Sequence, residues 1–83
     1  MKEPKELNVY YYAVLKEKSG KTEEDIESIA ATPLELYKDL ARKYDFPLDS
    51  RSIRVSINEE FQSMDTVLCS GDRVIFIPPV AGG

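Results

Sequence analysis

The chain has 83 residues, 42% of them hydrophobic and 31% charged, which is enough for one small domain with a single core. Eleven Lys and Arg residues against 15 Asp and Glu residues give a net charge of -4. That balance argues against a sequence-independent nucleic-acid binder and suits association with a positively charged protein surface. A single cysteine excludes an intramolecular disulfide, and the absence of histidine argues against a zinc site.

No apolar run approaches the roughly 18 residues of a membrane-spanning helix, and no h-region follows the charged start of the chain. We therefore expect a cytoplasmic protein that contacts neither membrane nor nucleic acid. Residues 1–6 are expected to form a short disordered lead. Residues 7–77 then form the folded domain, and residues 78–83 form a flexible tail.

The segment 7–13 is rich in aromatic and branched residues and predicts a strand. Its side chains alternate between two faces, with Leu7, Val9 and Tyr11 on one and Tyr10 and Tyr12 on the other. Polar residues 16–21 predict a connection. The acidic segment 22–29 predicts a short edge strand, because charge on an edge blocks unwanted pairing.

The pattern over residues 32–45 predicts a helix. Thr32 is a good N-cap, Pro33 suits the first helical position, and Glu35 completes a capping box. One apolar face follows from spacings of three and four, with members Leu34, Tyr37, Leu40, Ala41 and Tyr44. Pro47 prevents the helix from continuing further.

Three strands are expected after the helix. Apolar residues alternate with polar ones over 53–57, and a turn at 58–60 leads into a brief return at Phe61. Residues 66–69 are a candidate short segment. Residues 74–77 are apolar on both faces, which predicts a central strand covered on each side. An open sheet with one helix on one face accounts for this order, an α+β architecture whose first and last strands lie side by side in the centre.

The chain ends in Pro78-Pro79-Val80-Ala81-Gly82-Gly83. The prolines stiffen the exit from the domain, and the glycines leave the last peptide units without side chains. Such a tail suits threading into a partner's active site. Joined to AMP, the Gly83 carboxylate becomes an acyl donor, and attack by sulfur then gives a thiocarboxylate, a soft nucleophile. We therefore interpret Gly83 as the reactive group.

Other candidates are weaker. Cys69 has no histidine to activate it, and a lone cysteine is usually a small buried hydrophobe. The acidic run 23–27 lacks the spacing of a calcium loop, so no metal site is predicted. Tyr12, Phe61 and Ile77 form either a surface patch beside the tail, where a partner docks, or ordinary core.

The whole pattern resembles the small subunit of molybdopterin synthase, a family of ubiquitin-like sulfur carriers. The resemblance rests on Tyr11-Tyr12-Ala13 with Lys16-Glu17 and Gly20, on Gly71-Asp72-Arg73-Val74, and on the segment from Phe76 to Gly83. It covers residues 7–83. Lys16 stands where the family often has arginine, and the charged lead is longer than usual.

The resemblance implies a β-grasp fold and a role as the sulfur carrier in molybdenum cofactor biosynthesis. An adenylyltransferase related to ubiquitin-activating enzymes would adenylate Gly83 with ATP, and a sulfur donor protein would convert it to the thiocarboxylate. The tail would then enter the large catalytic subunit of a heterotetramer, where sulfur passes to cyclic pyranopterin monophosphate to build the dithiolene. The chain itself would bind no cofactor and be inactive alone. Tyr12, Phe61 and Ile77 match the family's apolar contact positions.

Two alternatives stay open. A sulfur carrier for thiamine or another thiolated product shares the fold and the Gly-Gly end. A ubiquitin-like modifier that forms isopeptide bonds with lysines begins with the same acyl adenylate.

Overall fold

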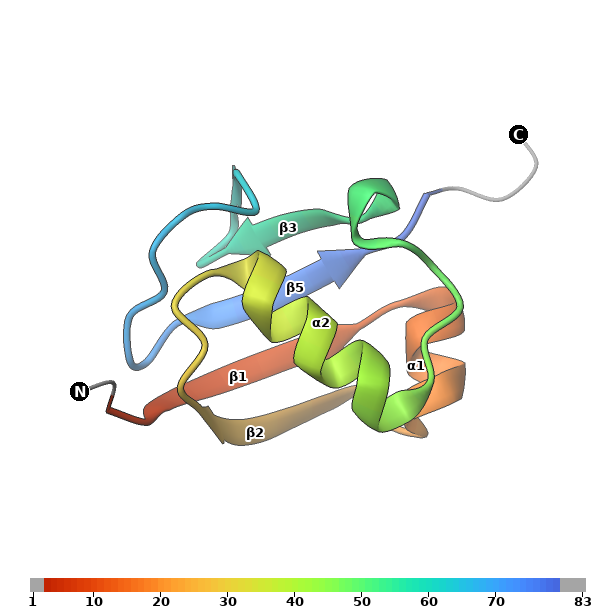
Figure 1. Ribbon diagram of the computed structural model, residues 1–83, viewed down its shortest axis with the longest axis horizontal. Helices are drawn as coiled ribbons and strands as arrows, with labels where there is room; N and C mark the ends of the chain where they lie inside the picture. The colour runs from red at the N-terminus through yellow and green to blue at the C-terminus, as the bar shows by residue number, and fades with distance from the viewer. Residues whose placement is uncertain (1–2, 80–83) are drawn as a thin grey trace.

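The computed structural model describes residues 3–79. Five strands form one mixed sheet in the order β2-β1-β5-β3-β4, with one long helix across it (Figure 1). The elements are β1 (Lys5–Tyr11), α1 (Ala13–Ser19), β2 (Glu23–Ser28), α2 (Pro33–Tyr44), the 3-10 helix η1 (Ser50–Ser52), β3 (Arg54–Ile57), β4 (Glu60–Gln62) and β5 (Arg73–Ile77). This order and topology confirm the predicted α+β, β-grasp architecture.

The two most apolar strands, β1 and β5, lie side by side in the middle of the sheet, as predicted, and run parallel. In their register Val9 lies opposite Val74, and Tyr11 lies opposite Phe76. All four side chains are fully buried beneath α2. The core therefore lies over the β1–β5 pair, and the parallel register brings the ends of both strands to the same edge of the molecule.

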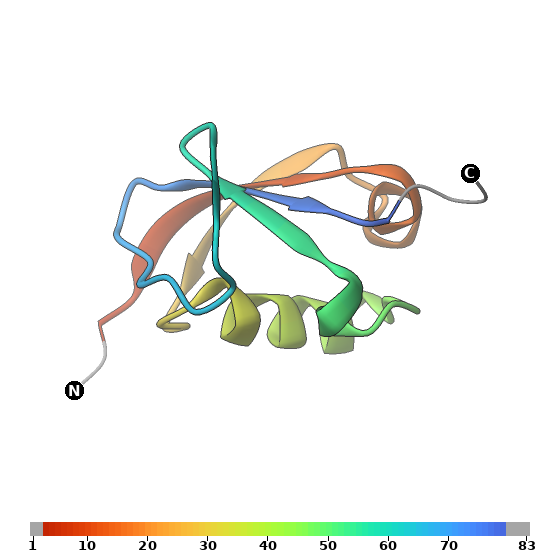
Figure 2. The ribbon, with the colours of Figure 1, turned by 90° about the horizontal axis from the view of Figure 1, so that it is seen from above.

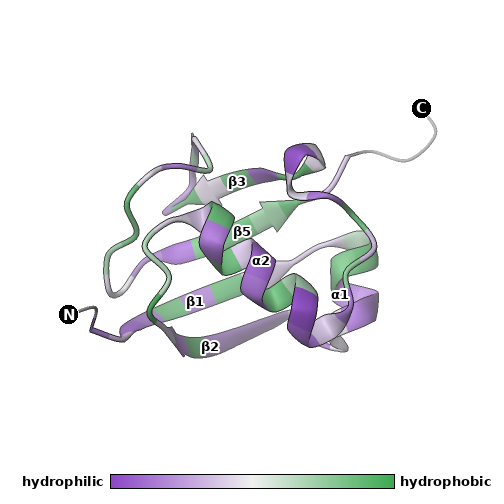
Figure 3. Ribbon diagram, in the orientation of Figure 1, coloured by the Kyte–Doolittle hydropathy of each residue, from purple (hydrophilic) through white to green (hydrophobic). Residues whose placement is uncertain are grey.

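Only one face of the sheet is covered by a helix. Figure 2 shows α2 beneath the sheet and no described helix across the opposite, open face. The prediction that β5 is covered on both sides is therefore wrong: Val74 and Phe76 are buried, but Ile75 and Ile77 face the open side and are half-buried. In Figure 3, β5 is hydrophobic after its first residue and β2 is largely hydrophilic, which fits their central and edge positions.

Helix α2 begins and ends at the predicted signals. The Thr32 Oγ1 accepts a hydrogen bond from the Glu35 backbone N–H at 3.3 Å, and Asp45 ends the helix in the left-handed region with φ of 59°. The predicted apolar face is shifted by a small rotation. Leu36, which the prediction omitted, is buried, whereas Leu34 is half-buried.

The predicted connection over residues 16–21 is wrong, because residues 13–19 form helix α1. Leu15 is fully buried and anchors the helix to the core, while most of its other side chains are exposed. Gly20 then ends it with φ of 74°, a conformation that glycine adopts without steric cost.

The predicted disordered lead over residues 1–6 is too long, since β1 already begins at Lys5. Lys5 lies opposite Ser28 in the β1–β2 ladder, and its Nζ donates to the Ala30 carbonyl at 3.2 Å. Strand pairing therefore extends two residues further than the apolar pattern suggested. At the other end of the domain, Pro78 is buried and Pro79 is exposed.

The hairpin after β3 follows the prediction. Asn58 and Glu59 connect β3 to β4 with φ values of 52° and 73°, as a two-residue type I′ turn requires. The candidate segment at 66–69 is a loop instead. Leu68 is buried and its N–H donates to the Ala31 carbonyl at 2.8 Å. Cys69, predicted to be buried, is exposed.

Candidate functional site

The domain ends in an apolar groove at the point where the tail leaves it. After β5, Pro78 is buried and Pro79 is exposed. The groove around them is lined by Tyr12, Ala13, Val14, Leu48, Ile77, Pro78 and Pro79. The remaining predicted tail residues, Val80, Ala81, Gly82 and Gly83, lie outside the described residues, so their roles stay predictions.

The sheet register places this groove beside the end of β1. Because Tyr11 lies opposite Phe76 in the parallel pair, the next residues of both strands, Tyr12 and Ile77, emerge at the same edge. Ala13 then turns the chain into α1 with φ of 51°, which is uncommon for a residue with a Cβ. Leu48, from the loop after α2, supplies the far wall of the groove and had no recognisable signal in the sequence.

The three predicted interface residues share one face of the molecule. Tyr12 is 46% exposed and Phe61 72% exposed, so neither is ordinary core. Tyr12 and Ile77 line the same groove, but Phe61 lies further away on β4. The structure thus brings two of the three residues together and places the third on the same sheet face, two strands away from β5.

Two further apolar residues, Tyr10 and Ile75, lie between Phe61 and the groove on the open face. In the register of the sheet, Phe61 lies opposite Ser56, Ser56 opposite Ile75, and Ile75 opposite Tyr10, which forms a row across the open face. The Tyr10 and Tyr12 rings lie 4.9 Å apart. We call the set Tyr10, Tyr12, Phe61, Ile75 and Ile77 the apolar centre. The sequence analysis did not propose Tyr10 and Ile75 for the interface. Each lies two positions from a proposed residue, Tyr12 or Ile77, and alternation puts residues at that spacing on the same face.

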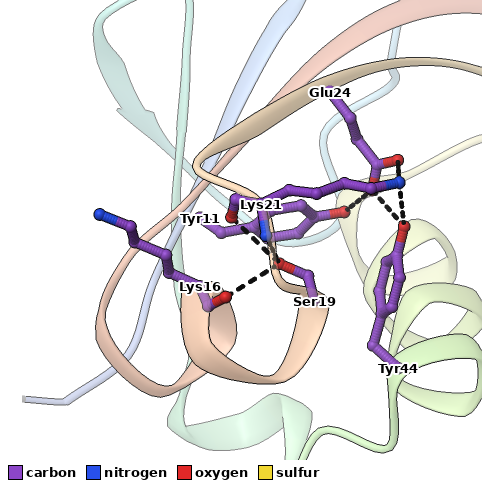
Figure 4. Close-up of polar contacts among 6 residues, drawn as sticks. All are labelled: Tyr11, Lys16, Ser19, Lys21, Glu24 and Tyr44. Atoms are coloured by element: carbon purple, nitrogen blue, oxygen red, sulfur yellow. Dashed lines mark hydrogen bonds and ion pairs between the residues drawn. The ribbon is translucent and has the colours of Figure 1, made fainter.

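A polar cluster fixes the end of β1 on the opposite face (Figure 4). The Glu24 carboxylate accepts hydrogen bonds from the Tyr11 hydroxyl at 2.6 Å, the Tyr44 hydroxyl at 2.7 Å and the Lys21 ammonium at 3.0 Å. The Lys21 Nζ also donates to the Tyr44 hydroxyl at 3.2 Å. The cluster therefore connects β1 and β2 to the last turn of α2, next to the edge from which the tail leaves.

The contacts within this cluster shift the pKa values of Glu24, Tyr11 and Lys21. Burial tends to raise the pKa of Glu24, but the donors Tyr11, Tyr44 and Lys21 together hold it below its ordinary value. Burial and the bond to Glu24 raise the pKa of Tyr11 far above its ordinary value. The pKa of Lys21 is also raised, chiefly by its bond to Glu24. At neutral pH the cluster thus holds an ionised Glu24 carboxylate beside the protonated Tyr11 hydroxyl and the Lys21 ammonium.

The other sequence candidates are dispersed. Glu24 faces the core side of β2, whereas Glu23 and Asp25 face the open side, so the acidic run does not converge on one point. Among residues 3–79 no group of three or more His, Cys, Asp or Glu side chains is arranged to hold a metal ion. No helix in this range is both long and apolar enough to cross a membrane.

Comparison with known protein families assigns the chain to one of them. The model of the ThiS family matches residues 9–83, which is nearly the whole chain. The chain belongs to the ThiS family.

Curated relatives of this ThiS-family chain share a name. The molybdopterin synthase sulfur carrier subunit of Haemophilus influenzae is 31% identical over 80 residues, covering 93% of this chain and 99% of the relative. The subunit of the same name from Mycobacterium tuberculosis is 34% identical over 80 residues, covering 93% of this chain and 96% of the relative. The predicted resemblance to the molybdopterin synthase small subunit is thereby confirmed.

A solved structure shares the fold over almost the same extent. The HVO 2177 protein of Haloferax volcanii superposes with a TM-score of 0.80 at 26% identity, covering 96% of this chain and 88% of that chain. The ThiS-family chain therefore has the β-grasp fold in a form also present in an archaeal protein.

Proposed function

We propose that this ThiS-family chain is the sulfur carrier subunit of a molybdopterin synthase and that the Gly83 carboxylate carries the sulfur. The main support is the match of nearly the whole chain to two relatives that bear this name. The geometry is compatible with the role, because the tail begins at an apolar groove beside a largely uncovered sheet face.

The proposed activation has two steps. The Gly83 carboxylate oxygen attacks the α-phosphorus of ATP on an adenylyltransferase related to ubiquitin-activating enzymes, and pyrophosphate leaves. With hydrosulfide as the sulfur source, sulfur then attacks the acyl carbon, a C–S bond forms, and the bond to the AMP oxygen breaks. The products are AMP and a thiocarboxylate, which is ionised and nucleophilic at neutral pH. In the cell we propose that a sulfur donor protein supplies the sulfur.

The proposed transfer takes place in a partner's active site. Six extended residues from Pro78 to Gly83 reach roughly 20 Å, which lets the tail enter a cleft while the domain stays outside. The thiocarboxylate sulfur attacks a side-chain carbon of cyclic pyranopterin monophosphate, so that a C–S bond forms and a C–O bond of the substrate breaks. Water then cleaves the bond between this sulfur and the Gly83 acyl carbon, which leaves the sulfur on the pterin and restores the Gly83 carboxylate. Two such transfers build the dithiolene. The catalytic side chains belong to the large subunit, so this chain is inactive alone, and ATP is consumed only on the activating enzyme.

We further propose that the apolar centre contacts the large subunit. Tyr12 and Phe61 expose large apolar side chains, which are typical of the central contacts of a protein interface. Ile77 connects this surface to the tail, because it lies in the groove with Pro78 and Pro79. A partner seated on this face would therefore meet the tail at its root, and two such pairs would form the heterotetramer.

Deletion of Gly83 tests the proposal. The truncated protein should fold as the full chain does, with the same circular dichroism spectrum and melting temperature, because residues 5–77 form the sheet and core. It should form no molybdopterin in a reconstituted system with the large subunit, cyclic pyranopterin monophosphate, the activating enzyme, ATP and sulfide. Substitution of exposed Glu17 by Gln is a matched control that should retain full transfer. Molybdopterin formation by the truncated protein would contradict the assignment.

The same reconstitution separates the alternatives. Thiocarboxylate formation without molybdopterin formation would favour a carrier for thiamine or another thiolated product. Conjugates of higher mass in a cell extract, lost on deletion of Gly83, would favour the ubiquitin-like modifier.

A further inference from the structure

Charged side chains are sorted to opposite sides of the open sheet face. The side formed by β1 and β2 carries four exposed carboxylates, which we call the acidic margin: Glu6, Glu23, Asp25 and Glu27. The side formed by β3 and β5 carries Arg54 and Arg73. The apolar centre lies between and beside these groups, and the Arg73 guanidinium sits 5.6 Å from the Tyr10 ring centroid. The open face is therefore apolar in the middle and electrically asymmetric.

The acidic margin has no cation of its own among residues 3–79, where the ion pairs all lie elsewhere. Its side-chain partner there is the amide of Asn8, which donates to Glu23 at 3.0 Å and to Asp25 at 2.9 Å. Glu6 and Glu27 lie directly opposite each other in the β1–β2 ladder, an arrangement in which like charges destabilise a sheet. The fold thus keeps a repulsive pair on the surface that a partner's cation would relieve.

We infer that the open face docks a protein surface whose apolar patch covers the apolar centre and whose Lys or Arg side chains face the acidic margin. The inference rests on the proposed function, because the occupant is the large subunit that receives the tail. A neutral or acidic surface in the same place would dehydrate the margin without pairing it, which is unfavourable. Charge complementarity therefore selects a basic partner surface along β2.

The asymmetry also sets the orientation of the partner. From Glu23, beside the tail edge, to Glu27 at the far end, the margin runs about 13 Å along β2. A partner turned by half a revolution would bring its cations against Arg54 and Arg73. Only one orientation places the partner's cations against the acidic margin and away from the two arginines. That orientation fixes where the partner's active site meets the tail. Because these charges lie at the border of the apolar centre, they act chiefly on the rate of association and on register.

Association kinetics with the cognate large subunit test this inference. The margin variant is Glu6→Gln/Glu27→Gln, which removes two charges without touching the Asn8 hydrogen bonds. The control variant is Glu17→Gln/Asp65→Asn, which makes the same change of net charge at exposed positions on α1 and in the loop after β4. Phe61→Ala reports on the apolar centre itself. Circular dichroism checks that each variant is folded before binding is measured.

We expect the margin variant to associate about fivefold more slowly than the wild type at about 50 mM salt, with little change in the dissociation rate. The difference should disappear near about 500 mM salt, where such charges are screened. Equal rates for the margin variant and the wild type, or an equal loss in the control variant, would overturn the inference while leaving the proposed function intact. Absence of wild-type binding, or binding unaffected by Phe61→Ala, would instead overturn the proposed docking face and this inference with it.

Discussion

Replacement of Glu24 by Gln should destabilise the domain and show how the end of β1 is held. The Glu24 side chain is 10% exposed and accepts hydrogen bonds from the hydroxyls of Tyr11 and Tyr44. A hydrogen bond to a charged group stabilises a protein by about 1.5–3 kcal/mol and a neutral one by about 0.5–1.5 kcal/mol. Losing the charge therefore costs about 1 kcal/mol for each tyrosine bond, or about 2 kcal/mol together.

Urea and thermal denaturation at pH 7, followed by circular dichroism, measure this loss. For a domain of this size, about 2 kcal/mol corresponds to a fall of about 10 °C in the melting temperature. Glu17→Gln is the matched control, since Glu17 is exposed on α1, and its free energy of unfolding should change by less than about 0.5 kcal/mol. A Glu24→Gln change as small as that of the control would refute the reasoning.

The difference between wild type and Glu24→Gln should also depend on pH. Hydrogen bonding lowers the folded-state pKa of Glu24 below its ordinary 4.5. A carboxyl group with a lowered pKa stabilises the fold above its unfolded pKa, and that stabilisation is lost as the pH falls through the folded value. The gap in unfolding free energy should therefore be full at pH 7 and shrink as the pH drops below 4.5. A gap that stays constant into acid would exclude the carboxylate charge as its cause.

Three further outcomes follow from local geometry. Glu59→Gly should stabilise the domain by about 0.5–1 kcal/mol, because glycine adopts the left-handed conformation of this type I′ turn position without the steric cost of a Cβ. Glu59→Ala keeps the Cβ and should not stabilise the domain, and the urea midpoints of the two variants test this difference. Thr32→Ala should cost about 1 kcal/mol through loss of the N-cap bond to Glu35, measured in the same way, and no loss would argue against the cap. Cys69 should react with a thiol reagent in the folded protein about as fast as in denaturant, whereas protection would show burial.

The elements with redundant local signals were predicted well. The cap, the first-turn proline and the apolar spacing all indicated α2, and the structure has the Thr32–Glu35 bond that they implied. Alternation alone put Leu7, Val9 and Tyr11 on one face of the strand and Tyr10 and Tyr12 on the other, and the structure buries the first set. Tyr12 was proposed for the interface because it matches an apolar contact position of the family that the sequence resembles.

The errors arose where tertiary contacts decide the structure. Helix α1 is short and mostly polar, and a single buried side chain, Leu15, holds it to the core. In the loop before β5, Leu68 occupies the core position and leaves Cys69 exposed, although the two are adjacent and both apolar. Leu48 reaches the groove only because the chain returns there after α2. None of these contacts has a local pattern that a sequence could reveal.

The central claim is that Gly83 carries sulfur, and intact-mass measurement tests it most directly. The protein is incubated with ATP, the activating enzyme and sulfide, with Gly83-deleted protein in parallel. Exchange of one carboxylate oxygen for sulfur should raise the mass of the full chain by about 16 Da and leave that of the truncated chain unchanged. An unchanged mass of the full chain, under conditions in which another carrier subunit is converted, would contradict the account.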